Sequence, residues 1–136
     1  MTKVRQIIDK GKTATQAEII MQLNPVLRGW ARYHRHVVSY DTFTRIDTLV
    51  WDKLWRWSKR RHPKKNQQWI KVRYFERHGT RDWIFACAKT PENLSYRPIL
   101  FRLSSIGIIR HVKIRAEANP FHPDWADYFD QRQKAA

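Results

Sequence analysis

The sequence predicts an α+β protein, with an α-helical N-terminal part followed by a smaller mixed α/β part with short strands. Three observations support this prediction. Apolar residues recur at spacings of three and four from Leu23 to Pro63, as in helices that bury one face. The composition then shifts at the polar connector, residues 64–66. Beyond the connector, short apolar runs alternate with glycine, proline and serine, as in strands joined by turns.

The first helices are indicated by residues that favour helix ends. Residues 3–10 resemble the end of a helix. Thr15 is placed to cap a second helix, with Glu18 three residues later as its capping-box partner. Asn24-Pro25 predicts an interruption and a restart with Asn24 as N-cap, because proline suits the first helical position. The restarted helix is expected to run to about Val38.

The next helix is predicted to begin at Ser39 or Asp41. It should end at His62-Pro63, because the residue before a proline avoids the helical conformation. Its inward positions follow the helical spacing and are Phe43, Ile46, Val50, Leu54 and Trp57. Across both long helices, the core is expected to include Leu27, Trp30, Leu54 and Trp57.

After Pro63 the elements are expected to be short. They are a helix at 69–75, a turn at 79–80, strands at 83–88, 98–103 and 108–114, and a last helix at 123–132. The chain is therefore expected to divide into a helical region, residues 1–62, and a basic connector with a small α/β region, residues 63–136.

The charge of the chain is far from balanced. Its 136 residues include 27 Lys and Arg against 12 Asp and Glu, a formal net charge of +15. Such a protein repels itself unless a polyanion is present, which implies RNA, DNA or an anionic membrane. No apolar run approaches the roughly 18 residues of a membrane span, so we expect no membrane partner. One cysteine, Cys87, excludes an internal disulfide, and we expect a soluble protein of a reducing compartment.

Positive charge is concentrated on the outer faces of the long helices. Arg28, Arg32 and Arg35 fall within roughly 60° of one another, opposite the apolar stripe. Between Lys53 and Arg81 there are eleven Lys and Arg residues and a single acid. A merely solvated face is the alternative, but such faces normally mix both signs. The predicted phosphate-binding residues are therefore Arg28, Arg32, Arg35, Lys53, Arg56, Lys59, Arg60, Arg61, Lys64, Lys65, Lys71 and Arg73.

Two tryptophans have two possible roles. Trp51 and Trp55 are one helical turn apart and lie off the main apolar stripe. They could stack on unpaired bases. Aromatic residues at helical spacing are more often packing residues, so the second interpretation is a packing surface against the C-terminal half or against another domain.

No group of residues indicates catalysis. The chain has no His-Glu-x-x-His motif and no cysteine pair, so no metal site is predicted. His34 lies on the apolar face and is expected to pack in the core. We therefore expect neither enzymatic activity of this chain nor a bound cofactor.

The residues of the first long helix carry a family resemblance. The segment 23–33, Leu-Asn-Pro-Val-Leu-Arg-Gly-Trp-Ala-Arg-Tyr, resembles the signature of the group II intron maturase-specific domain. This domain is the helical X, or thumb, region of intron-encoded reverse transcriptases. The similarity continues through Phe43, Asp47, Trp51, Leu54, Trp55, Trp57, residues 59–63, Trp69, Lys71, Tyr74, Phe75 and residues 83–85. The tail, at 111–120 with Trp125, Tyr128 and Phe129, is similar to the region that precedes the HNH endonuclease of these proteins.

The resemblance implies a non-catalytic module that binds group II intron RNA and assists splicing or mobility. It also implies contact with target DNA by the part after Pro63, and a polymerase domain of the parent protein as partner. No Tyr-x-Asp-Asp tetrapeptide and no HNH cysteine pairs occur, so the chain is expected to be an excised fragment or a remnant reading frame. The expected location is the bacterial cytoplasm, or an organelle in a eukaryote.

The alternative function is a thumb and DNA-binding fragment of a reverse transcriptase. It would position a template–primer duplex or a DNA target for a catalytic domain that this chain lacks. Sequence-specific DNA binding would need side chains that read base edges, and the sequence does not identify any.

Overall fold

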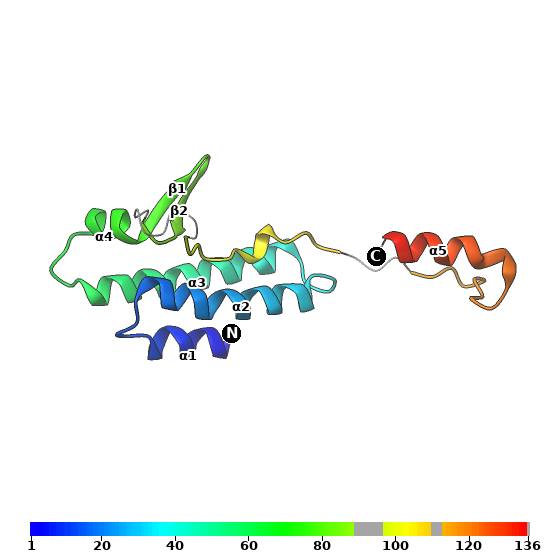
Figure 1. Ribbon diagram of the computed structural model, residues 1–136, viewed down its shortest axis with the longest axis horizontal. Helices are drawn as coiled ribbons and strands as arrows, with labels where there is room; N and C mark the ends of the chain where they lie inside the picture. Colours follow the sequence, from blue (N-terminus) through cyan, green and yellow to red (C-terminus); the bar gives the residue numbers. More distant parts are fainter. Residues whose placement is uncertain (89–96, 110–112, 136) are drawn as a thin grey trace.

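The computed structural model describes residues 1–88, 97–109 and 113–135 (Figure 1). Within these residues, the helices and an antiparallel hairpin confirm the α+β class. The helices are α1 (Thr2–Lys10), α2 (Gln16–His34), α3 (Tyr40–Arg61), α4 (Gln67–Tyr74) and α5 (Ala126–Ala135). The strands are β1 (Phe75–His78) and β2 (Arg81–Phe85), and the described residues also include the 3-10 turns η2 (Leu103–Ser105) and η3 (Pro123–Trp125).

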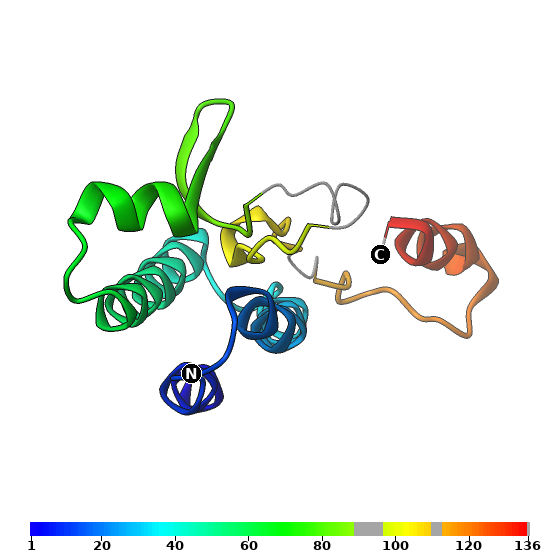
Figure 2. The same ribbon diagram turned by 60° about the vertical axis from the view of Figure 1, so that its left-hand side comes forward.

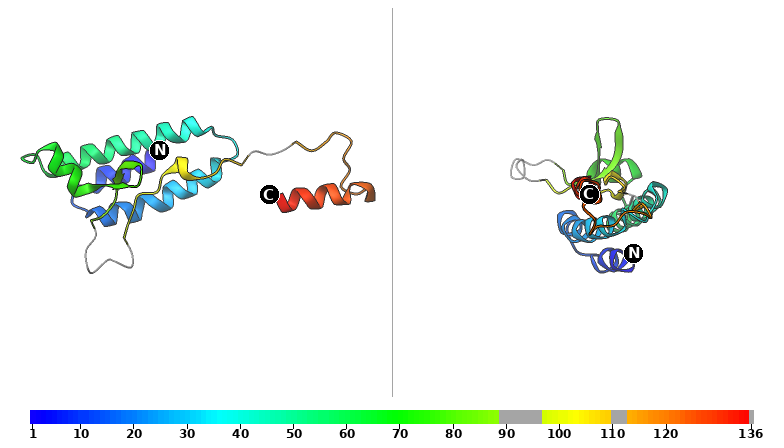
Figure 3. Two further views of the ribbon diagram at one scale, coloured as in Figure 1. Left: turned by 90° about the horizontal axis from the view of Figure 1, so that it is seen from above. Right: turned by 90° about the vertical axis from the view of Figure 1, so that its right-hand side faces the viewer.

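The helices α2 and α3 lie side by side and form the central layer (Figure 3). Helix α1 covers one side of this layer and contacts both long helices. The hairpin and the segment 97–109 cover the other side, where η2 contacts α2 and α3 (Figure 2). The long helices therefore have two different sides, the α1 side and the hairpin side.

Side-chain caps fix where the helices begin. Thr15 accepts a hydrogen bond from the backbone N–H of Glu18, and the Glu18 carboxylate accepts one from the N–H of Thr15, at 2.7 Å. This capping box was expected from the sequence. Ser39 caps α3 and Asn66 caps α4 through the N–H of Trp69, at 2.8 Å. Each cap satisfies a backbone donor that has no partner within its helix.

The predicted interruption at Asn24-Pro25 is wrong, because α2 continues through Pro25. The predicted end near Val38 is also wrong, because α2 ends at His34 and the chain then turns, with the N–H groups of Val37 and Val38 donating to the carbonyl of His34. The Asn24 side chain does not cap a helix. Its amide nitrogen donates to the carbonyl of Ile99 at 2.9 Å, and its oxygen accepts from the N–H of Phe101 at 2.7 Å. Proline in a helix interior removes one backbone hydrogen bond. Pro25 is exposed, and tertiary packing of the buried face of α2 outweighs this local loss.

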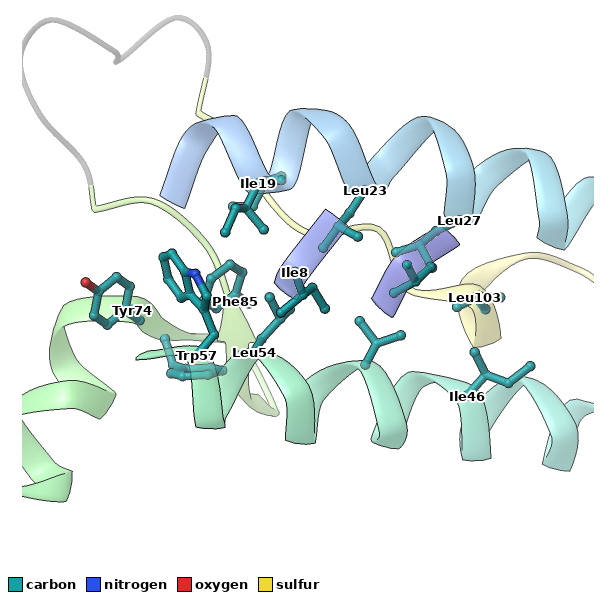
Figure 4. Close-up of a cluster of buried hydrophobic side chains, with 14 of the residues drawn as sticks. Ile8, Ile19, Leu23, Leu27, Ile46, Leu54, Trp57, Tyr74, Phe85 and Leu103 are labelled. Atoms are coloured by element: carbon teal, nitrogen blue, oxygen red, sulfur yellow. The ribbon is translucent and has the colours of Figure 1, made fainter. Parts of the chain in front are cut away.

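The core lies where α1, α2, α3, the hairpin and η2 converge (Figure 4). Leu27, Leu54 and Trp57 are buried, as expected. Trp30 is only half-buried, so its predicted core position is only partly correct. The centre of its ring lies 5.9 Å from the ring centre of Phe43 and 4.4 Å from that of His34, which is also half-buried.

The second half departs most from the expectation. The helix predicted at 69–75 is α4, which begins two residues earlier and ends at Tyr74, and the chain then turns at Phe75 into β1, which pairs antiparallel with β2. The segments at 98–103 and 108–109 are not strands, apart from an isolated bridge between Ala86 and Ile99. Residues 110–112 of the last predicted strand lie outside the described residues. Apolar runs alone do not distinguish a strand from an extended segment packed on helices.

The last helix packs on its own flanking segment. It begins at Ala126 after η3, which is three residues later than predicted. The backbone N–H of Arg115 donates to the hydroxyl of Tyr128, and Arg132 donates to the carbonyl of Lys113. Phe85 and Leu103, which follow residue 62, belong to the same core cluster as residues of α1–α3. The division of the chain at residue 62 stays a prediction.

Candidate nucleic-acid interface

Trp51 and Trp55 pack against the hairpin. Their rings stack on each other with centroids 5.9 Å apart and an angle of 10° between planes. Trp83 of β2 meets both rings edge-on at 5.5 and 5.4 Å, and Phe75 lies 5.9 and 5.7 Å from them. The packing interpretation of these two tryptophans is therefore confirmed. Base stacking by them stays a prediction.

The α2 stripe consists of Arg28, Arg32 and Arg35. Arg28 and Arg32 are exposed, and Arg35 is half-buried. The guanidinium of Arg28 lies 5.5 Å from the ring centre of Phe101, and the carbonyl of Arg35 accepts from the N–H of Ile109. Both contacts are made to the segment 97–109. The α2 stripe therefore borders the hairpin side of the molecule.

The α3 stripe consists of Lys53, Arg56 and Arg60, which fall within roughly 60° of one another on the helix. Arg56 and Arg60 are exposed and Lys53 is half-buried. Arg60 lines a groove of about 330 Å³ together with Lys12 and with Ile8 of α1. The α3 stripe therefore borders the α1 side, and the hairpin lies on the other side of α2 and α3 (Figure 2).

The sequence analysis did not select Lys12. It follows α1, is exposed, and brings a further positive charge to the groove that Arg60 lines. Only the packing of α1 against α3 reveals this neighbourhood. A basic residue close to Gly11 was visible in the sequence, but nothing there connected it to a residue almost fifty positions away.

Four more of the predicted residues surround the end of α3 and α4. Lys59, Lys64, Lys65 and Arg73 are all exposed. Lys59 lies 5.9 Å from the ring centre of Trp55, and Lys65 lies 5.2 Å from that of Trp69. These cation–π contacts orient the side chains and leave the ammonium groups at the surface.

Two of the predicted residues make internal contacts instead. Arg61 donates to the carbonyl of Ala14, and its guanidinium lies 4.7 Å from the ring centre of Trp57. Lys71 forms an ion pair with Asp82 at 3.0 Å and lies 4.5 Å from the ring centre of Trp83. In this arrangement Arg61 connects α3 to the loop before α2, and Lys71 connects α4 to the hairpin.

His62 and Asp82 have shifted pKa values. Burial lowers the pKa of His62, with further contributions from Arg61, Arg73 and Lys65. The His62 Nε2 lies 2.7 Å from the hydroxyl of Tyr74, so a neutral ring can accept the Tyr74 O–H. The hydrogen bond from the N–H of Trp83 lowers the pKa of Asp82, and the hydrogen bond from Lys71 lowers it further. Asp82 is therefore ionised opposite Lys71.

A family model described as "Group II intron, maturase-specific domain" matches residues 1–75. The chain belongs to this family. The matched part of this maturase chain includes α1 to α4, and therefore both stripes. No curated protein matches the chain.

The maturase-specific domain is distinct from the polymerase domain of intron-encoded proteins, and the matched region is the former. Among the residues that the structure describes, no group of three or more His, Cys, Asp or Glu is arranged to hold a metal ion. None of the described helices is long and apolar enough to cross a membrane.

Proposed function

We propose that this maturase chain binds group II intron RNA through phosphate contacts and has no catalytic role of its own. It neutralises the phosphate charge of RNA segments and holds these segments together, while the intron RNA itself carries out the chemical steps. The observation that carries the proposal is the arrangement of Arg and Lys residues, most of them exposed, in two stripes on the matched domain, within a chain of net charge +15.

The two stripes support binding of two RNA segments. The α2 stripe borders the hairpin side, and the α3 stripe borders the α1 side. A straight RNA helix that lies against one side does not reach the stripe on the other side. Two segments of a folded intron, one at each stripe, would therefore share the protein as a positively charged spacer between their phosphate backbones.

The first experiment measures how affinity depends on salt. If six to ten phosphates are contacted, the affinity for a structured intron RNA should fall by roughly 10³–10⁵-fold between 50 and 200 mM salt. The fall should be smaller on single strands, which release fewer counterions. Affinity that does not change with salt would contradict phosphate binding.

The second experiment tests whether the stripes act separately. Two differently labelled intron segments are mixed with the protein, and their co-association is followed by energy transfer. Arg28→Ala with Arg32→Ala, or Arg56→Ala with Arg60→Ala, should abolish co-association while binding of a single segment is only weakened. Binding that depends on duplex length alone, with no preference for intron RNA, would favour the alternative of a template–primer or DNA-positioning fragment.

A further inference from the structure

A groove on the hairpin side lies between α3, β2 and residues 100–102. Its volume is about 320 Å³, within the range of roughly 300–1,000 Å³ that small-molecule sites occupy. It lies beyond the two stripes, and Phe101 is the only residue it has in common with the contacts described for them.

The walls of the groove are largely aromatic and aliphatic. Trp51 and Val50 come from α3, Trp83 from β2, and Leu100 and Phe101 from the extended segment. Trp83 has a φ of +60°, which is unfavourable for a bulky side chain. The surrounding contacts hold this strained residue in place, since its N–H donates to Asp82 and its ring meets Trp51 and Trp55. Strain of this kind is concentrated at functional sites.

Polar groups of α3 belong to residues that line the same groove. The indole N–H of Trp51 is buried and has no hydrogen-bond partner among the described residues. Thr44 and Thr48 use their hydroxyl protons within α3, donating to the carbonyls of Tyr40 and Thr44. Their oxygen atoms keep acceptor capacity. The groove thus offers two acceptors between apolar walls, whereas the buried N–H of Trp51 is closed to a ligand in this arrangement.

Two guanidinium groups also line the groove. Arg81 is exposed and makes no ion pair among the described residues, and Arg102 lies 3.6 Å from the carboxylate of Asp47. The Asp47 carboxylate also accepts from the N–H groups of Leu103 and Ser104. Arg102 is therefore held at the groove by Asp47, whereas Arg81 is free to meet an anion.

We propose that this groove takes the base of one unpaired RNA nucleotide. A flat ring with a polar edge matches apolar walls that carry two acceptors, and the guanidinium of Arg81 matches the phosphate that accompanies the base. The inference rests on the proposed function, because it concerns how the same RNA is bound. It adds a site that recognises a single-stranded nucleotide to two stripes that contact only phosphates.

The test compares three RNA hairpins that differ at one position. One carries a single bulged nucleotide, the second carries an abasic residue in place of that nucleotide, and the third is fully paired. The full chain should bind the bulged hairpin about 5- to 150-fold more tightly than the abasic one, the range expected for one base held against aromatic side chains. The abasic and paired hairpins should bind alike.

Two variants with matched controls locate the effect. Thr48 is exposed and lines the groove, so the larger side chain of Thr48→Phe should fill it. This variant should lose the preference for the bulged hairpin and should still bind the paired hairpin. Leu49→Phe adds the same side chain one residue away, at a position that does not line the groove, and should keep the preference. Arg81→Gln should reduce the preference, whereas Arg5→Gln, an equal loss of charge on α1, should not.

The outcomes separate the two proposals. If no hairpin binds, both the proposed function and the nucleotide site fail. If wild type binds all three hairpins equally, RNA binding stands but the nucleotide site is wrong, and an apolar side chain of a protein partner becomes the better occupant. A preference that survives in Thr48→Phe, with the fold intact by circular dichroism, would also overturn the site.

Discussion

At the scale of single residues, Trp57 joins three parts of the core. Its side chain is 4% exposed, its indole N–H donates to the carbonyl of Gly11 at 2.8 Å, and Arg61 covers its ring. Trp57→Ala should lower the free energy of unfolding by about 3–5 kcal/mol, measured by urea denaturation. Trp69→Ala is the matched control. This ring is 37% exposed, so the loss should be only about 1–2 kcal/mol. Equal losses of unfolding free energy in the two variants would contradict the placement of Trp57 in the core.

His62 should make stability depend on pH. Its pKa is lowered in the folded state from the ordinary value of 6.5, mainly by burial. The unfolded chain therefore takes up the proton first as the pH falls. The contribution of His62 to the free energy of unfolding is therefore complete above about pH 6.5. It is lost as the pH falls toward the folded-state pKa.

The measurement is the melting temperature of wild type and His62→Gln between pH 5 and 8. Wild type should lose more stability on acidification than the variant, because glutamine does not titrate. Parallel curves for the two proteins would show that His62 does not have the lowered pKa.

At the scale of elements, Asn24 fastens an irregular segment to a helix. Its two hydrogen bonds, to Ile99 and Phe101, satisfy backbone groups of a segment that has no sheet partner beyond one bridge. Asn24→Ala should cost about 1–3 kcal/mol and should speed hydrogen exchange at the amide of Phe101. Gln22→Ala, an exposed neighbour on the same helix, is the control and should change neither quantity. Unchanged exchange in Asn24→Ala would contradict the role of this side chain.

At the scale of the whole molecule, the stripes and the tryptophans should respond differently to alanine. Arg32→Ala should weaken binding to many RNA sequences alike and reduce the salt slope by about one unit or less, with an unchanged melting temperature. Trp51→Ala opens the aromatic cluster beneath the hairpin, and should cost about 2–4 kcal/mol of stability. Its binding of fully paired RNA should fall only as a consequence of unfolding.

Both quantities are measured on the same purified variants. Arg32→Ala protein that binds intron RNA with wild-type affinity would leave the α2 stripe without a function. Trp51→Ala protein that melts like wild type but binds less RNA would favour direct stacking of this ring on a base.

Local chemistry made much of the helical part predictable. The capping box of Thr15 and Glu18, the cap at Ser39 and the stop at His62-Pro63 are decided by residues within one turn of each helix end. The repeat of apolar residues likewise identified the buried face of α3. For the same reason the sequence identified the outer arginine stripes, because helical spacing alone places these residues opposite a buried face.

What the sequence determined by itself was therefore the α+β class, the start of α2, both ends of α3, the family resemblance and the excess of positive charge. Only the tertiary structure decided the rest. Long-range packing kept α2 continuous through Pro25, placed the two stripes on opposite sides, and brought Trp51 and Trp55 against the hairpin. It also assigned Arg61 and Lys71 to internal contacts. The physical reason is that these outcomes depend on contacts between residues far apart in the chain, and the periodicity of one element carries no information about its neighbours.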